Sequence, residues 1–88
     1  MKWIEISITV EVAVIDEMAA IFNDIESNGY IEETIANNPN LSRMTIYLGV
    51  DKDEEQWKQI IETALQDANI SYRDMVSKTV DDEQWYHS

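Results

Sequence analysis

Residues 51–62, DKDEEQWKQIIE, have acids at the spacing of a calcium-binding loop. Positions one, three, five and twelve of such a loop are held by Asp51, Asp53, Glu55 and Glu62. The sharp turn of that loop needs glycine at position six, where this sequence has Gln56. We therefore predict that Asp53 caps a helix starting near Glu54, with acids at the favourable end of the helix dipole.

Other residues that could carry out chemistry are few or lack a partner. The chain has no cysteine, which removes disulfides, thiolate nucleophiles and Cys-ligated zinc. Its one histidine, His87, stands next to the last residue, where we expect no second group to orient it. Gly29 and Gly49 are too few for a glycine-rich phosphate loop or a G-x-G cofactor turn. Adjacent acids such as Glu32 and Glu33 point apart on a strand, so we expect solvated surface and no catalytic, cofactor or metal site.

The composition is that of one acidic globular domain. The 88 residues are 44% hydrophobic and include only two Gly and one Pro, which suits a single core. Eighteen Asp and Glu against six Lys and Arg give a formal charge of −12, which repels nucleic acid and attracts a basic protein. The same acidity could also serve only solubility. The N-terminus has no apolar run of signal or membrane length, so we expect a cytoplasmic protein without membrane contact.

Hydrophobic spacing predicts the first four elements. Apolar and polar residues alternate over 4–12, which indicates a half-buried strand. Apolar residues three and four apart indicate a helix from about 14 to 27. It has no convincing N-cap, and Asn28 and Gly29 would end it. A weaker strand over 30–35 and a turn around Pro39 lead to a third strand over 44–50.

The second helix has the clearest signals. Asp53 and Gln56 have the spacing of a capping box, and Asn69 can close the helix. One face of the helix is apolar and consists of Trp57, Ile60, Ile61, Ala64, Leu65 and Ala68. Residues 70–80 are then long enough for a fourth strand, and their mixed pattern indicates an edge position or a bulge.

The order β-α-β-β-α-β predicts an α+β fold of the ferredoxin-like type. Right-handed crossovers place both helices on one face of a four-stranded antiparallel sheet with strand order 4-1-3-2. The uncovered faces of the two central strands carry Trp3, Glu5, Ser7, Thr9, Thr45 and Tyr47. We predict a protein-binding surface there, in which Trp3, Glu5, Ser7, Thr45 and Tyr47 contact the partner.

Three other functions are known for domains of this topology. RNA-binding domains of this topology stack bases on the two central strands, but MTIYLGV lacks their basic residue and aromatic pair, and the charge is unfavourable. A small enzyme of the acylphosphatase type would need an Arg-containing glycine-rich loop after the first strand, which is absent. A homodimer through the open sheet face, acting as a regulatory or ligand-sensing unit, stays an alternative.

Four short segments, MKWIEISITV, YIEE, YLGVDKD and TVDDEQW, resemble parts of the N-terminal domain of the bacterial ribosomal-protein L-eleven methyltransferase (PrmA) family. MKWIEISITV resembles its opening Trp-x-Glu strand, and an Ala-Val-rich helix ends at Asn28 and Gly29 where the family has a Gly pair. YIEE and YLGVDKD are similar to its second and third strands, and TVDDEQW to the acidic segment that leaves the domain. In that family this domain is ferredoxin-like and recognises the substrate, while a Rossmann-like domain binds S-adenosylmethionine and methylates the ribosomal protein.

The resemblance implies a division of the chain into a recognition domain and the start of a linker. Residues 1–80 would bind a basic ribosomal protein, and 81–88 would lead to a missing methyltransferase domain that holds S-adenosylmethionine. This chain would then catalyse nothing by itself. Trp85 and Tyr86 would find their packing partners in that missing domain. An acidic docking face would speed the encounter with a basic substrate and reject RNA.

Overall fold

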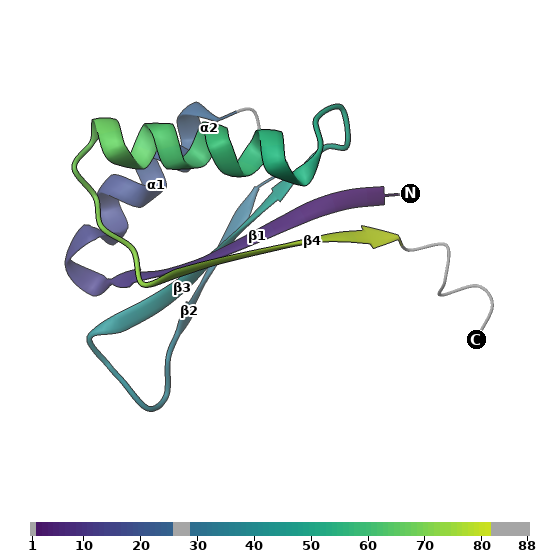
Figure 1. Ribbon diagram of the computed structural model, residues 1–88. Helices are drawn as coiled ribbons and strands as arrows, with labels where there is room; N and C mark the ends of the chain where they lie inside the picture. The colour runs from purple at the N-terminus through teal and green to yellow at the C-terminus, as the bar shows by residue number, and fades with distance from the viewer. Residues whose placement is uncertain (1, 26–28, 82–88) are drawn as a thin grey trace, which may run out of the picture.

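The computed structural model describes residues 2–25 and 29–81. Its elements are β1 (Lys2–Glu11), a 3-10 turn η1 (Val12–Val14), α1 (Ile15–Asp24), β2 (Tyr30–Thr34), β3 (Leu41–Leu48), α2 (Glu54–Asp67) and β4 (Asp74–Asp81). The strands form one antiparallel sheet in the order β2-β3-β1-β4, and both helices lie on the same side of it (Figure 1). This arrangement confirms the predicted α+β ferredoxin-like fold and its strand order.

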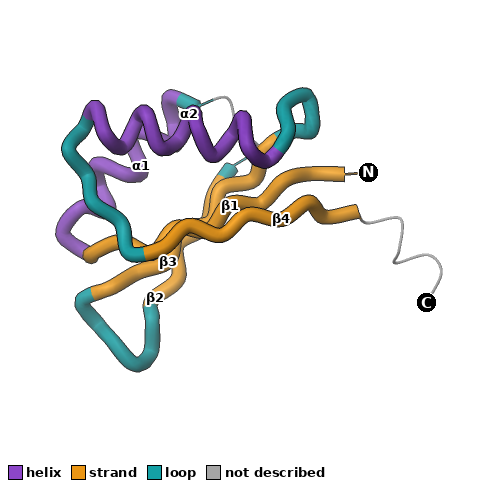
Figure 2. Tube along the Cα trace, viewed as in Figure 1, coloured by secondary structure: helices purple, strands orange, loops and turns teal. Residues whose placement is uncertain are grey.

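The core lies between the sheet and the helices, which form two layers in Figure 2. The inward side chains of β1 are almost fully buried, and Ile6 stands directly opposite Ile46 of β3. The helices complete the core with Met18, Phe22, Trp57, Ile61 and Leu65. No helix within residues 2–25 and 29–81 is long and apolar enough to cross a bilayer.

β1 ends one residue earlier than predicted. Val12 belongs to η1 and is 46% exposed, although the alternation placed it among the buried residues. The cause is the length of the partner strand, because β3 begins at Leu41, which pairs with Glu11. Val12 donates its N–H to the Asn40 carbonyl at 2.9 Å, and the chain then leaves the sheet.

α1 begins without a side-chain cap, as predicted, but it is shorter than the apolar pattern indicated. It ends at Asp24, and Ile25 already has an extended backbone with ψ 136°. Ser27 and Asn28, where the helix was expected to end, lie outside the described residues. Gly29 has a φ of +113°, a value that favours glycine.

β3 begins earlier and ends earlier than the predicted strand over 44–50. It ends at Leu48, and Val50 is 53% exposed in the following turn. The turn is fixed by Trp57, whose indole N–H donates to the Gly49 carbonyl at 2.9 Å. This bond holds the start of α2 against the end of β3.

α2 begins with the predicted capping box. Asp53 accepts from the Gln56 N–H at 2.8 Å, and the Gln56 side chain accepts from the Asp53 N–H at 3.0 Å. Asn69, at φ 57°, ends the helix, and Ile70 donates its N–H to the Leu65 carbonyl at 2.9 Å. The prediction is wrong for two residues of the apolar face, because Ile60 and Ala68 are exposed.

β4 is shorter at its start than the predicted strand over 70–80. It begins at Asp74, because Ile70 forms part of the helix end and packs into the core at 7% exposure. β4 continues to Asp81, where the linker was expected to start. Residues 82–88, which include Trp85, Tyr86 and His87, lie outside the described part of the chain.

Candidate functional site: the open face of the sheet

The five predicted contact residues lie together on the sheet face that the helices leave uncovered, which we call the open face. Their positions in β1 and β3 alternate with core residues, so their side chains point away from the helices. Glu5 stands opposite Tyr47, and Ser7 stands opposite Thr45. Trp3 is opposite Val80 of β4. The antiparallel register therefore brings the five residues into one surface.

Trp3 and Glu5 form a linked pair at one end of this face. The indole N–H of Trp3 donates to Glu5 Oε2 at 2.9 Å, and the other carboxylate oxygen lies 4.0 Å from the Lys78 ammonium. The Glu5 side chain is only 18% exposed, whereas that of Lys78 is 68% exposed. Because its N–H is already bonded, Trp3 offers a partner the apolar surface of its ring.

The middle of the open face is made of small polar side chains that bond to one another. The hydroxyls of Ser7 and Thr45 are 2.9 Å apart, and Thr9 donates to Asp74 at 3.0 Å. Thr45 is only 6% exposed, so it supports the surface from beneath and presents little area to a partner. The other four predicted contact residues are half-buried: Trp3, Glu5, Ser7 and Tyr47.

Apolar residues on the outer strands, which the sequence pattern did not predict, complete the face. Ile31 of β2 stands opposite Thr45 and is 42% exposed, and Val76 of β4 stands opposite Ser7 and is 61% exposed. Val80 is half-buried beside Trp3. The alternation in these two strands is weak, so only their register with β1 and β3 shows which side each residue faces.

The charges on the open face nearly balance. In the rows from Trp3 to Thr9 the face carries Glu5, Glu33 and Asp74 against Arg43 and Lys78. Three acids against two bases leave a net charge of −1 in these rows, so most of the formal charge of −12 lies elsewhere on the chain. An almost neutral face is cheaper to desolvate than an acidic one.

The ionisable groups with shifted pKa values lie away from the open face. Hydrogen bonds from Thr79 and Ser77, at 2.7 and 2.8 Å, lower the pKa of Glu54. A hydrogen bond to Glu62 raises the pKa of Tyr72. Glu54 is the first residue of α2, so its two bonds tie the start of that helix to β4. Within the described ranges, no three potential metal-ligating side chains form a cluster.

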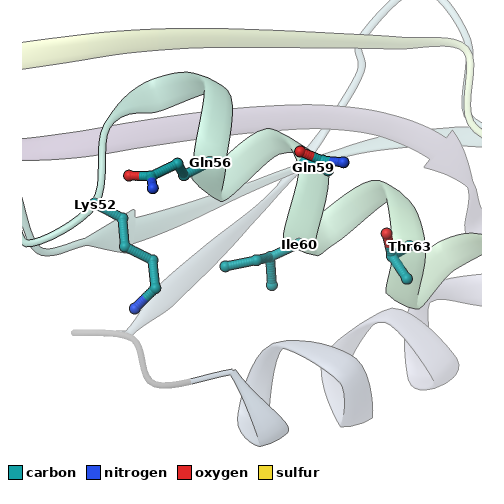
Figure 3. A pocket seen from close by; sticks show the side chains of 5 residues that line it. All are labelled: Lys52, Gln56, Gln59, Ile60 and Thr63. Carbon is teal, nitrogen blue, oxygen red and sulfur yellow. The ribbon is translucent and has the colours of Figure 1, made fainter.

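A depression of about 440 Å³ lies beside α2 (Figure 3). Its lining consists of Lys52, Gln56, Gln59, Ile60 and Thr63. Lys52 and Ile60 extend to the same side of the helix, and the Lys52 ammonium lies 4.8 Å from the centre of the Trp57 ring. This contact places the ammonium over the face of the indole ring and holds Lys52 at the rim of the depression.

Comparison with known proteins supports the fold. No family model matches the sequence, and no curated protein matches it. The structure of LarC2, the C-terminal domain of a cyclometallase involved in synthesis of the NPN cofactor of lactate racemase, is similar with a TM-score of 0.66 at 9% identity. The alignment covers 91% of this chain and 55% of LarC2, so this chain spans about half of that domain.

A second similar structure is aligned over nearly its whole length. CPII, a nitrogen regulatory PII-like protein from Thiomonas intermedia K12 bound to ADP, AMP and bicarbonate, has a TM-score of 0.55 at 10% identity. The alignment covers 92% of this chain and 97% of CPII. At such low identity both likenesses concern the fold alone, and they define this chain as a ferredoxin-like α+β domain.

Proposed function

We propose that this chain is a protein-recognition domain that binds its partner through the open face. The observation that carries the proposal is the composition of that face. Trp3 stands opposite Val80 at one end of the face, and Tyr47 lies two residues along β3 from Thr45, which is opposite the exposed Ile31. The exposed Val76 stands opposite Ser7, whose hydroxyl already bonds to that of Thr45. Exposed apolar surface with aromatic residues and few unpaired charges is typical of the centre of a protein interface.

For the partner, we propose a basic ribosomal protein. The support is the resemblance of the strand segments to the PrmA family, in which such a domain recognises the substrate. The chain would then work in the cytoplasm beside a methyltransferase domain that holds S-adenosylmethionine. The formal charge of −12 would attract a basic partner from a distance, while the nearly neutral open face would make the contact.

The test is a binding titration of the chain with ribosomal protein L-eleven. We expect Trp3→Ala and Tyr47→Ala each to weaken binding about tenfold or more, as truncation of a central aromatic commonly does. Ile60→Ala is the control, because Ile60 is 37% exposed on α2, which lies on the other side of the sheet. Unchanged binding in both open-face variants would remove this surface from the proposal.

A homodimeric regulatory or ligand-sensing module is the second candidate. It is favoured by the fold shared with a PII-like regulatory protein and by the exposed Ile31 and Val76, which a second copy could cover. In this case sedimentation should show a dimer that Trp3→Ala dissociates. A chain that sediments as one species before and after Trp3→Ala argues against an open-face dimer.

A further inference from the structure

β4 leaves one side of the sheet open to another strand. Among the strands of residues 2–25 and 29–81 it is the last in the order β2-β3-β1-β4, and β1 is the one strand of these that it pairs with. Along its outer side, N–H and C=O groups of alternate residues point away from β1, which makes an edge strand a template for pairing. Its eight residues contain no proline, and Val76 at its middle is 61% exposed.

The other edge of the sheet differs in length and charge. β2 has five residues, and two of them are the adjacent acids Glu32 and Glu33. Two copies of this edge paired with the axis at Glu32 or at Glu33 would place acids of both chains opposite each other, which destabilises a strand pair. β4 instead has the acid Asp74 and the base Lys78 four residues apart on the open face, with Val76 halfway between them.

We propose that β4 pairs antiparallel with β4 of a second copy, across a two-fold axis at Val76. In this register Val76 faces Val76 of the second copy, and Asp74 faces Lys78 on both sides of the axis. Side chains directly opposite one another in an antiparallel pair point to the same face. All three residues lie on the open face, so the apolar contact is flanked by two pairs of opposite charge.

Neighbouring registers lose this complementarity. With the axis at Ser77, Lys78 would face Val76, and with the axis at residue 78 the two Lys78 side chains would face each other. With the axis at Met75, Asp74 would face Val76. Only the register centred on Val76 pairs Asp74 with Lys78, so charge selects it among the arrangements that keep each side chain on its own face.

The edge pairing leaves the proposed binding surface accessible. Two sheets of four strands would join into one continuous sheet of eight. Ile31, Thr45, Ser7 and Val76 form one row across each sheet, and pairing would place the two rows end to end. Trp3 stays on the open face, which distinguishes this dimer from one that packs the two faces together.

The experiment measures self-association of the full chain by sedimentation equilibrium at physiological salt. We expect a concentration-dependent dimer whose dissociation constant rises about tenfold or more in Lys78→Glu, because acids then face each other twice. Asp74→Lys should have the same effect with lysines. A mixture of the two variants should form a heterodimer, since both contacts then join opposite charges.

Ile31→Lys is the matched control, because Ile31 is an exposed apolar residue of the open face on the opposite edge strand. It should leave the dissociation constant unchanged, and thermal unfolding should show that every variant folds. Three results would overturn the proposal: a wild-type monomer at all concentrations, a dimer indifferent to both charge changes, or a dimer lost in Ile31→Lys. Binding of the ribosomal protein is measured separately, so either proposal can fail alone.

Discussion

The two faces of the central strands are held by different forces, although they come from alternating residues of the same segments. On the helix side Ile6 faces Ile46, and both are completely buried. One residue further along, Ser7 faces Thr45 on the open face, and their hydroxyls lie 2.9 Å apart. Packing dominates the first face and hydrogen bonding the second. Substitutions on the open face should therefore lower the free energy of unfolding less than substitutions on the packed face.

The largest expected effect is on the packed face. Ile6→Ala should lower the free energy of unfolding by about 2–5 kcal/mol, because it removes buried methyl groups and leaves a cavity. At a concentration at which the chain is monomeric, Val76→Ala on the open face should change it by less than about 0.5 kcal/mol, since Val76 is 61% exposed in the single chain. Urea unfolding of both variants measures the difference, and equal losses would contradict the contrast between the faces.

The helix layer should also depend on the cap of α2. Asp53→Ala removes a side chain that accepts from the Gln56 N–H, and should cost about 0.5–2 kcal/mol in the free energy of unfolding. Asp51→Ala is the control, because Asp51 is an exposed acid of the same turn whose contact is a 3.4 Å surface pair with Lys52. An equal decrease in the free energy of unfolding in Asp53→Ala and Asp51→Ala would show that the negative charge stabilises the helix and that the capping hydrogen bond does not.

On the open face, the hydroxyl pair should show coupling. Ser7→Ala should cost about 0.5–1.5 kcal/mol, because Thr45 is 6% exposed and loses its partner. Adding Thr45→Val removes the orphaned hydroxyl, so the double variant should cost less than the sum of the two single variants. Urea unfolding of the four proteins gives the coupling energy, and strict additivity would show that the two hydroxyls are independent.

The smallest effect concerns pH and the contact between α2 and β4. The pKa of Glu54 is lowered by its hydrogen bonds to Thr79 and Ser77, so its ionised form stabilises the folded chain. This contribution is complete above the carboxyl pKa of the unfolded chain and is lost as the pH falls through the lower pKa of the folded chain. Wild-type and Glu54→Gln stabilities should therefore converge below pH about 4. A difference that does not change between pH 7 and pH 3 would refute this.

Local patterns predicted the parts of the fold that depend on neighbours in the chain. The alternation in β1 identified its buried side, and the Asp53–Gln56 spacing identified the start of α2. Where the pattern was wrong, a distant segment decided the outcome. Val12 leaves the sheet because β3 begins at Leu41, and Ile70 leaves the strand because it completes the end of α2.

The sequence predicted the residues of the candidate site on the two central strands but not those on the outer strands. Alternation alone predicts that Trp3 and Tyr47 lie on the open face, and the strand registers agree. The burial of Thr45 and the addition of Ile31 and Val76 depend on which strands flank the centre. No short-range pattern encodes that pairing, because residues far apart in sequence come together only in the folded sheet.

The sequence by itself determined which side of each central strand is apolar, because side chains in a strand alternate with a period of two residues. It also determined the acidic charge of the chain and the cap of α2. The tertiary structure alone decided where the strands end, which outer residues join the open face, and that its charges nearly balance. These properties depend on register, and register arises from contacts between whole strands rather than from any one of them.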